Sequence, residues 1–83
     1  MIIKELLKNI IGTQKLYFIE QHKTAYEAAK SMLDYKCGAL LVCNDTNARD
    51  LAGIITERDL AFRIIPQNLK PSETKISSIM TKK

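Results

Sequence analysis

The 83-residue sequence has no tryptophan, a single histidine, two cysteines and three glycines that stand far apart. Two cysteines, Cys37 and Cys43, are too few for a disulfide framework, and we expect both to be free thiols in a reducing compartment. With one histidine, His22, and no Cys-x-x-Cys spacing, no metal site is predicted. The scattered glycines exclude a glycine-rich phosphate loop. Nothing orients Cys37 and His22 as a nucleophile and its base, so we expect a protein that is not an enzyme.

Long apolar runs and a concentration of one charge are also missing. No uncharged run approaches the ~20 apolar residues that a membrane-spanning helix needs. Lys4, Glu5 and Lys8 interrupt the apolar N-terminus, which excludes a signal peptide, so we expect a cytoplasmic protein with no membrane partner. The net charge of +4 is spread along the chain without a basic stripe. It mildly favours anionic ligands, and a basic nucleic-acid-binding domain is a lesser alternative.

The composition that is present fits one globular domain, with 46% hydrophobic and 27% charged residues. A chain this short buries only about 60–65% of its unfolded surface, so its stability is marginal and a partner would add to it. We therefore expect residues 1–83 to form a single domain. It divides into an N-terminal helix at 1–12, a motif body at 16–65 and a linker at 66–83.

Hydrophobic periodicity predicts an α+β (or α/β) fold in the order helix, strand, helix, strand, strand, helix and tail. The expected strands lie at 16–19, 39–43 and 51–55. Thr24 and Glu27 form a capping box that opens the second helix, and Gly38 is expected to end it with a positive φ. The third helix is expected to begin at Thr56 and to end at Pro66. The short polar link between the last two strands predicts antiparallel pairing, within a small three-stranded mixed sheet that has its helices on one face.

The linker repeats an apolar spacing from the start of the chain. Three of its residues match three in the N-terminal helix: Ile76, Ile79 and Met80 correspond to Ile3, Leu6 and Leu7. The linker is therefore predicted to lead toward a second motif that is missing.

The segment from Gly53 to Asp59 is the candidate binding site. A strand leads directly into a helix start, where unpaired N–H groups and the positive end of the helix dipole attract phosphate. Thr56 can offer a hydroxyl to the anion, and the Asp59 carboxylate suits the paired hydroxyls of a ribose. Thr-x-x-Asp is also an ordinary capping arrangement, so the structural and the ligand-binding interpretation both stay open.

Three segments carry a family resemblance: Thr24–Ala29, Gly38–Val42 and above all Gly53–Leu60, which reads Gly-Ile-Ile-Thr-Glu-Arg-Asp-Leu. With these residues the chain resembles the CBS domain family, and 76–81 looks like the stretch that leads into a following CBS motif. The resemblance implies paired motifs that hold AMP, ADP or ATP in the clefts between them. The nucleotide would be a ligand, and no cofactor would be required.

The resemblance also implies roles for individual residues. By position, Asp59 would bind ribose, Thr56 would bind ribose or phosphate, and Arg58 is a weaker phosphate candidate. Four strand residues would line the adenine slot: Ala39, Leu40, Ile54 and Ile55.

Only one complete motif is present in this chain. A small sheet with one uncovered apolar face must bury that face, so we expect a homodimer formed through CBS–CBS pairing. The expected function is a regulatory module that senses an adenine nucleotide through the pairing of motifs. The alternative is a purely structural dimerisation module that binds no ligand.

Overall fold

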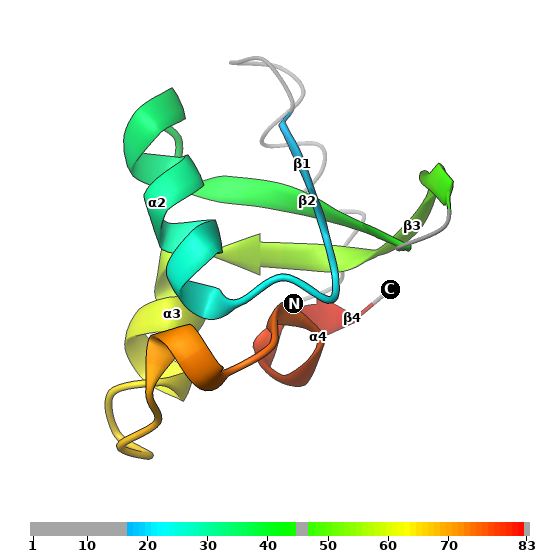
Figure 1. Cartoon of the computed structure of the whole chain (residues 1–83). Helices are drawn as coiled ribbons and strands as arrows, with labels where there is room; N and C mark the ends of the chain where they lie inside the picture. Colours follow the sequence, from blue (N-terminus) through cyan, green and yellow to red (C-terminus); the bar gives the residue numbers. More distant parts are fainter. Residues whose placement is uncertain (1–16, 45–46, 83) are drawn as a thin grey trace.

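A computed structural model describes residues 17–44 and 47–82 (Figure 1). The helix expected at 1–12, and Leu16 at the start of the first expected strand, lie outside these residues. The described elements follow one another as β1 (Phe18–Glu20), α2 (Ala25–Tyr35), β2 (Ala39–Asn44), β3 (Asn47–Thr56), α3 (Glu57–Arg63), a 3₁₀ turn η1 (Pro71–Glu73), α4 (Ile76–Ile79) and β4 (Thr81–Lys82).

The described strands form one mixed sheet in the order β1-β2-β3-β4. β1 pairs with β2 in parallel, β2 pairs with β3 antiparallel as expected, and β3 pairs with β4 antiparallel. The expectation of three strands is corrected to four, because the chain's tail adds β4 beside Gly53 and Ile54. A two-residue strand has no alternating pattern, so only this long-range pairing defines it.

The main core lies between the sheet and the helices. Leu40 and Val42 of β2 and Ile55 of β3 point to this side. They join buried residues of α2 and α4 and the residue that follows α3: Ala25, Ala28, Met32, Ile76, Ile79 and Ile64. Figure 1 shows α2 and α3 next to each other at the end of the sheet where β2 begins and β3 ends. For the helices that the structure describes, the expectation of helices on one face is confirmed. The burial of aliphatic side chains here is the main favourable contribution to folding.

Two central side chains on the opposite side of the sheet are also buried. Leu41 pairs with Ile54 in the register, and these residues alternate with those that face the helices. Their exposed fractions are 6% and 0% in the single chain. We expected an uncovered apolar sheet face that would force a second copy to pair with it. These two side chains do not supply that driving force, because they are already shielded from solvent.

Local sequence signals set the beginning of α2. Thr24 Oγ1 accepts a hydrogen bond from the Glu27 amide at 3.2 Å, and Glu27 Oε1 accepts one from the Thr24 amide at 3.3 Å. The predicted capping box is therefore confirmed. The hydrogen bond from the Thr24 backbone, partly offset by desolvation, lowers the pKa of Glu27 from its ordinary 4.5.

The end of α2 differs from the expectation. Lys36, with φ of 55°, takes the left-handed conformation, and no described glycine has a positive φ. The Lys36 and Cys37 amides donate to Leu33 O and Met32 O, which ends the helix at Tyr35, before Gly38 is reached. Gly38 instead lies just before β2, and its carbonyl accepts a hydrogen bond from the Glu57 amide at 2.9 Å.

The segment expected as a linker packs onto the motif body. The Ala25 amide donates to Thr74 O, and the Ile76 amide donates to Lys23 O, both at 2.8 Å. Ile76 and Ile79 are 0% and 3% exposed. This part of the tail is thus a structural component of the domain, whereas its continuation into a second motif stays a prediction.

Candidate functional site

Thr56 and Asp59 form a second capping box at the start of α3. The Asp59 amide donates to Thr56 Oγ1 at 3.1 Å, and the Thr56 amide donates to Asp59 Oδ2 at 3.0 Å. The structural interpretation of Thr-x-x-Asp is therefore confirmed. This reciprocal bonding fixes both side chains relative to the end of β3.

The other carboxylate oxygen of Asp59 is turned toward a different set of groups. Asp59 is 8% exposed, and it is the one described polar or charged residue that is buried. Its Oδ1 lies 3.6 Å from Arg63 Nε and accepts a hydrogen bond from Thr81 Oγ1 at 3.5 Å. Both distances are long for such interactions, so Oδ1 can still accept a shorter and stronger hydrogen bond from another donor.

Asp59 lines a pocket of about 360 Å³, which we term the α3 pocket. Its walls are Arg58, Asp59, Phe62, Arg63 and Thr81. The Arg58 guanidinium lies over the Phe62 ring, 5.2 Å from the ring centroid. Two guanidinium groups and one carboxylate thus surround a hollow within the size range of small-molecule sites. This arrangement offers a hydrogen-bond acceptor for hydroxyl groups and cations for an anion.

The helix start contributes less to anion binding than we expected. The Glu57 amide is bonded to Gly38 O, and the Asp59 amide is bonded to Thr56 Oγ1. These two amides are already used within the domain. A phosphate at the α3 pocket would depend mainly on the arginine side chains.

The structure places the predicted site residues in two groups. Asp59 and Arg58 lie in the wall of the α3 pocket, and Thr56 lies next to it through its bonds to Asp59. The expected adenine-slot residues are not in that wall. Leu40, Ile54 and Ile55 are 1%, 0% and 0% exposed, and Ala39 is half-buried. Their adenine-binding role stays a prediction.

Sequence reasoning missed three residues of the α3 pocket. Phe62 and Arg63 stand on the same helix as Asp59, and Arg63 is one turn beyond it, so the spacing of Asp59 and Arg63 could have indicated an i,i+4 pair. Thr81 had no such signal, because only the return of the tail to β3 brings it near Asp59.

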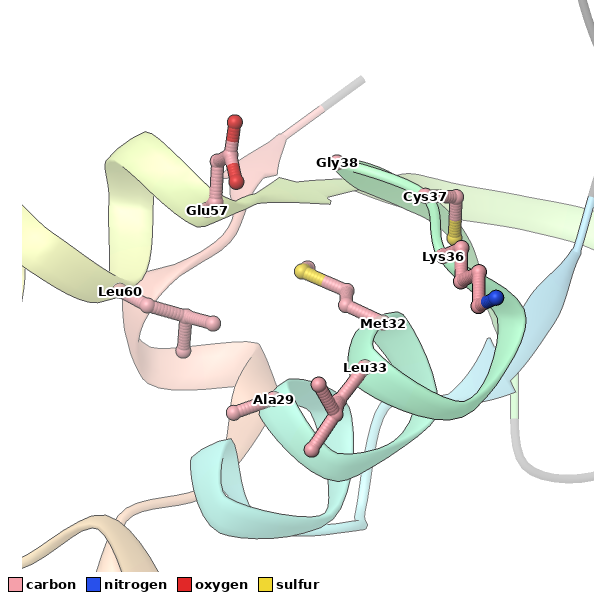
Figure 2. Close-up of a pocket in the computed structure, with 8 residues that line it drawn as sticks. All are labelled: Ala29, Met32, Leu33, Lys36, Cys37, Gly38, Glu57 and Leu60. Atoms are coloured by element: carbon pink, nitrogen blue, oxygen red, sulfur yellow. The ribbon is translucent and has the colours of Figure 1, made fainter.

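A larger and more apolar hollow of about 540 Å³ lies on the other side of α3 (Figure 2). Its walls come from α2, the turn that follows α2, and α3. They carry Lys36 and Glu57 but no pair of cations, so we place the candidate nucleotide site in the smaller α3 pocket. Within the described part of the chain, no helix is long and apolar enough to cross a membrane.

These observations define a small α+β domain whose tail completes its own sheet beside a charged pocket. The chain belongs to the CBS domain family: the family model matches residues 3–66.

The relatives agree with this assignment. CBSX3, a mitochondrial CBS domain-containing protein of Arabidopsis thaliana, is 47% identical over 58 residues, which cover 70% of this chain and 28% of that protein. The chain therefore spans less than a third of this relative.

Solved structures share the fold. A putative signal-transduction protein with CBS domains from Burkholderia ambifaria has a TM-score of 0.76 and 32% identity, covering 99% of this chain and 58% of that one. The CBS domain protein PAE2072 from Pyrobaculum aerophilum, solved in complex with AMP, has a TM-score of 0.75 and 17% identity. That match covers 84% of this chain and 52% of the other.

Proposed function

We propose that this chain is a regulatory module that binds an adenine nucleotide (AMP, ADP or ATP) at the α3 pocket and catalyses no reaction. The observation that carries the proposal is that Asp59 shares the pocket wall with Arg58 and Arg63, and that its Oδ1 lies 3.6 Å from Arg63 Nε. Ribose hydroxyls would donate to Oδ1, and the phosphates would lie against the guanidinium groups. A protein of the same fold holds AMP, which supports this choice of ligand.

The proposed ligand would replace weak contacts with stronger ones. Arg63 Nε and Thr81 Oγ1 are both at 3.5 Å or more from Oδ1, so a ribose hydroxyl at ordinary distance would bond more strongly to it. Asp59 Oδ2 would keep its bond to the Thr56 amide. The helix cap therefore survives ligand binding, and the site needs little rearrangement.

Pairing with a second CBS motif is part of the proposal. The pocket is open along one side of α3 and has no adenine-sized apolar slot among its five lining residues. A second motif, from another copy of this chain or from additional sequence, would cover the base. Ligand binding would then favour the paired state, because a ligand held by both motifs binds that state more tightly.

The rival is a structural pairing module that binds nothing. It has one observation in its favour: the two reciprocal hydrogen bonds of the Thr56–Asp59 box form without a ligand. Isothermal titration calorimetry with AMP, ADP and ATP distinguishes the two. The proposal predicts saturable heat with at least one nucleotide, and the rival predicts none at millimolar concentration with a folded, paired protein. Inorganic phosphate serves as the control for binding by charge alone, which the net charge of +4 makes necessary.

A further inference from the structure

The tail of the chain contacts the same carboxylate that is proposed to bind ribose. Thr81, the first residue of β4, donates from its hydroxyl to Asp59 Oδ1 at 3.5 Å. Thr81 is also a wall residue of the α3 pocket, whereas the other four wall residues all belong to α3. The helix therefore fixes most of the pocket, and one part of its wall depends on where the tail lies.

Arg63 connects Asp59 to the end of α4. Its Nε lies 3.6 Å from Asp59 Oδ1, and its Nη1 donates to Ile79 O at 3.1 Å and to Met80 O at 3.3 Å. One guanidinium group thus serves the pocket carboxylate and two carbonyls of the tail at the same time. The Arg63 side chain is half-exposed, so an anion that enters the pocket can reach it.

The last residues of the tail are held less firmly than α4. Ile76 and Ile79 of α4 are buried in the core, and the Ile76 amide donates to Lys23 O at 2.8 Å. The strand β4 has two residues, and Lys82 in it is exposed. A short strand at the edge of a sheet opens at a lower cost than the core does. Loss of the contacts of Thr81 and Arg63 would therefore act on the end of the tail and leave α4 anchored.

A nucleotide in the α3 pocket would draw on the groups that hold the tail. A ribose hydroxyl would donate to Asp59 Oδ1 in place of the Thr81 hydroxyl. A phosphate would attract the Arg63 guanidinium, because a bidentate bond to an anion is stronger than bonds to neutral carbonyls. Each of these exchanges removes a contact between α3 and the tail.

We propose that an adenine nucleotide and the tail compete for Asp59 and Arg63, so that ligand binding loosens residues 79–82 from α3 and β3. This inference rests on the proposed function, because it needs a nucleotide in the α3 pocket. Asp59 Oδ2 keeps its bond to the Thr56 amide, so the rearrangement is confined to the tail. The tail is the segment predicted to lead toward a second motif, so its last residues are where occupancy of the pocket is passed on. By linkage, a change that loosens the tail strengthens nucleotide binding.

Hydrogen exchange of the Met80 amide tests the release. It is measured by NMR with and without whichever of AMP, ADP and ATP gives saturable heat in calorimetry. This amide donates to Ile76 O at 2.9 Å, beside the carbonyls that Arg63 holds. The expected result is exchange at least about fivefold faster with the nucleotide bound.

The Ala28 amide is the internal control for this measurement. It donates to Thr24 O at 3.0 Å in the first turn of α2, outside the pocket wall, and should exchange no faster with the nucleotide bound. A Met80 exchange rate that the nucleotide lowers or leaves unchanged overturns the inference, because the ligand would then tighten the tail or have no effect on it.

Thr81→Val tests the competition from the side of the tail. It removes the hydroxyl that donates to Asp59 Oδ1 and nearly retains the shape of the side chain. Nucleotide affinity should therefore rise about twofold, the effect of one weak hydrogen bond. Thr74→Val is the matched control, because it removes a hydroxyl bond to Lys70 O elsewhere in the tail, and it should leave the affinity unchanged. Circular dichroism of each variant establishes that it remains folded. Equal or weaker binding by Thr81→Val contradicts the inference, because its hydroxyl would then not compete with the ligand.

Calorimetry separates failure of this inference from failure of the proposed function. A folded, paired protein that gives no saturable heat with AMP, ADP or ATP overturns both. Saturable binding without faster exchange of the Met80 amide overturns only the competition between nucleotide and tail. The module would then bind its ligand without moving the tail.

Discussion

Thr56 and Asp59 exchange two hydrogen bonds, from amide to hydroxyl at 3.1 Å and from amide to carboxylate at 3.0 Å. This box connects the last residue of β3 to the first turn of α3, so it sets where the helix begins. It also orients Asp59 so that its second oxygen reaches the α3 pocket. One local motif therefore serves both folding and the proposed ligand site.

The threonine side of the box has a measurable structural role. Thr56→Val removes the hydroxyl acceptor for the Asp59 amide and is expected to cost about 1 kcal/mol of unfolding free energy, the typical value of a helix N-cap. Thr56→Ser retains the hydroxyl, and serine is as good an N-cap as threonine. Its unfolding free energy should therefore lie within a few tenths of a kcal/mol of the parent's. Urea unfolding followed by circular dichroism measures both. Equal stability of the valine and serine variants would show that the cap contributes nothing.

Gly53 is expected to be irreplaceable for a steric reason. A Cβ built on Gly53 would overlap the Thr81 carbonyl oxygen and lie 3.2 Å from Met80 Sδ. A backbone carbonyl cannot rotate away, so Gly53→Ala should displace β4 and destabilise the domain by about 1–3 kcal/mol.

Gly38→Ala is the control for Gly53→Ala. Its Cβ would meet Glu57 Oε1 at 3.2 Å, the far end of a flexible side chain, and Gly38 has no positive φ. We expect the unfolding free energy to change by no more than about 0.5 kcal/mol. The reduced conformational freedom of the unfolded chain offsets the cost of a small shift of the Glu57 side chain. A Gly53→Ala variant as stable as Gly38→Ala would contradict the close approach of β4 to β3.

Arg63 holds the tail of the chain through its guanidinium group. Arg63 Nη1 donates to Ile79 O at 3.1 Å and to Met80 O at 3.3 Å, at the end of α4. Arg63→Met should speed hydrogen exchange of the Met80 amide about fivefold, the effect of losing ~1 kcal/mol of local stability. Arg58→Met, which removes only a contact with Phe62, should leave that exchange rate unchanged. Equal rates in the two variants would show that Arg63 does not hold the tail.

Acid should weaken the first capping box. The pKa of Glu27 is lowered in the folded protein, chiefly by the hydrogen bond from the Thr24 backbone amide. The carboxylate therefore contributes stability that is complete above its ordinary pKa of 4.5 and is lost as the pH falls through the lower folded value. Thermal unfolding at pH 3 and pH 7 should show a smaller acid-induced loss in Glu27→Gln than in the parent. An identical loss in both proteins would show that other carboxyl groups account for it.

Both capping boxes could be predicted from the sequence because each depends on residues three positions apart. The antiparallel pairing of β2 and β3 had a similarly local signal in the polar link between two apolar runs. In these cases the interacting residues are close in the chain, so local chemistry determines the structure.

Features that depend on tertiary contacts were not predictable in this way. The strand β4 exists because Thr81 and Lys82 return to β3, and nothing in those residues alone indicates a strand. For the same reason Thr81 was not expected beside Asp59. At the end of α2, Lys36 takes the left-handed conformation, two residues before the glycine that was expected to do so. Gly38 instead lies against Glu57, a contact that only the folded chain creates.

The central claim is that a nucleotide binds in the α3 pocket through Asp59. Amide NMR spectra recorded during titration with AMP test it most directly. The account predicts that amide signals from residues 58–63 and 80–82 shift and saturate, and that Asp59→Asn weakens the affinity by about tenfold or more, as expected for a hydrogen bond to a charged group. The control variant Asp50→Asn, on the exposed part of β3, should bind AMP with the same affinity as the parent. An Asp59→Asn protein that binds AMP with the affinity of the parent would contradict the account. So would the absence of chemical-shift changes at millimolar AMP in a folded and paired protein.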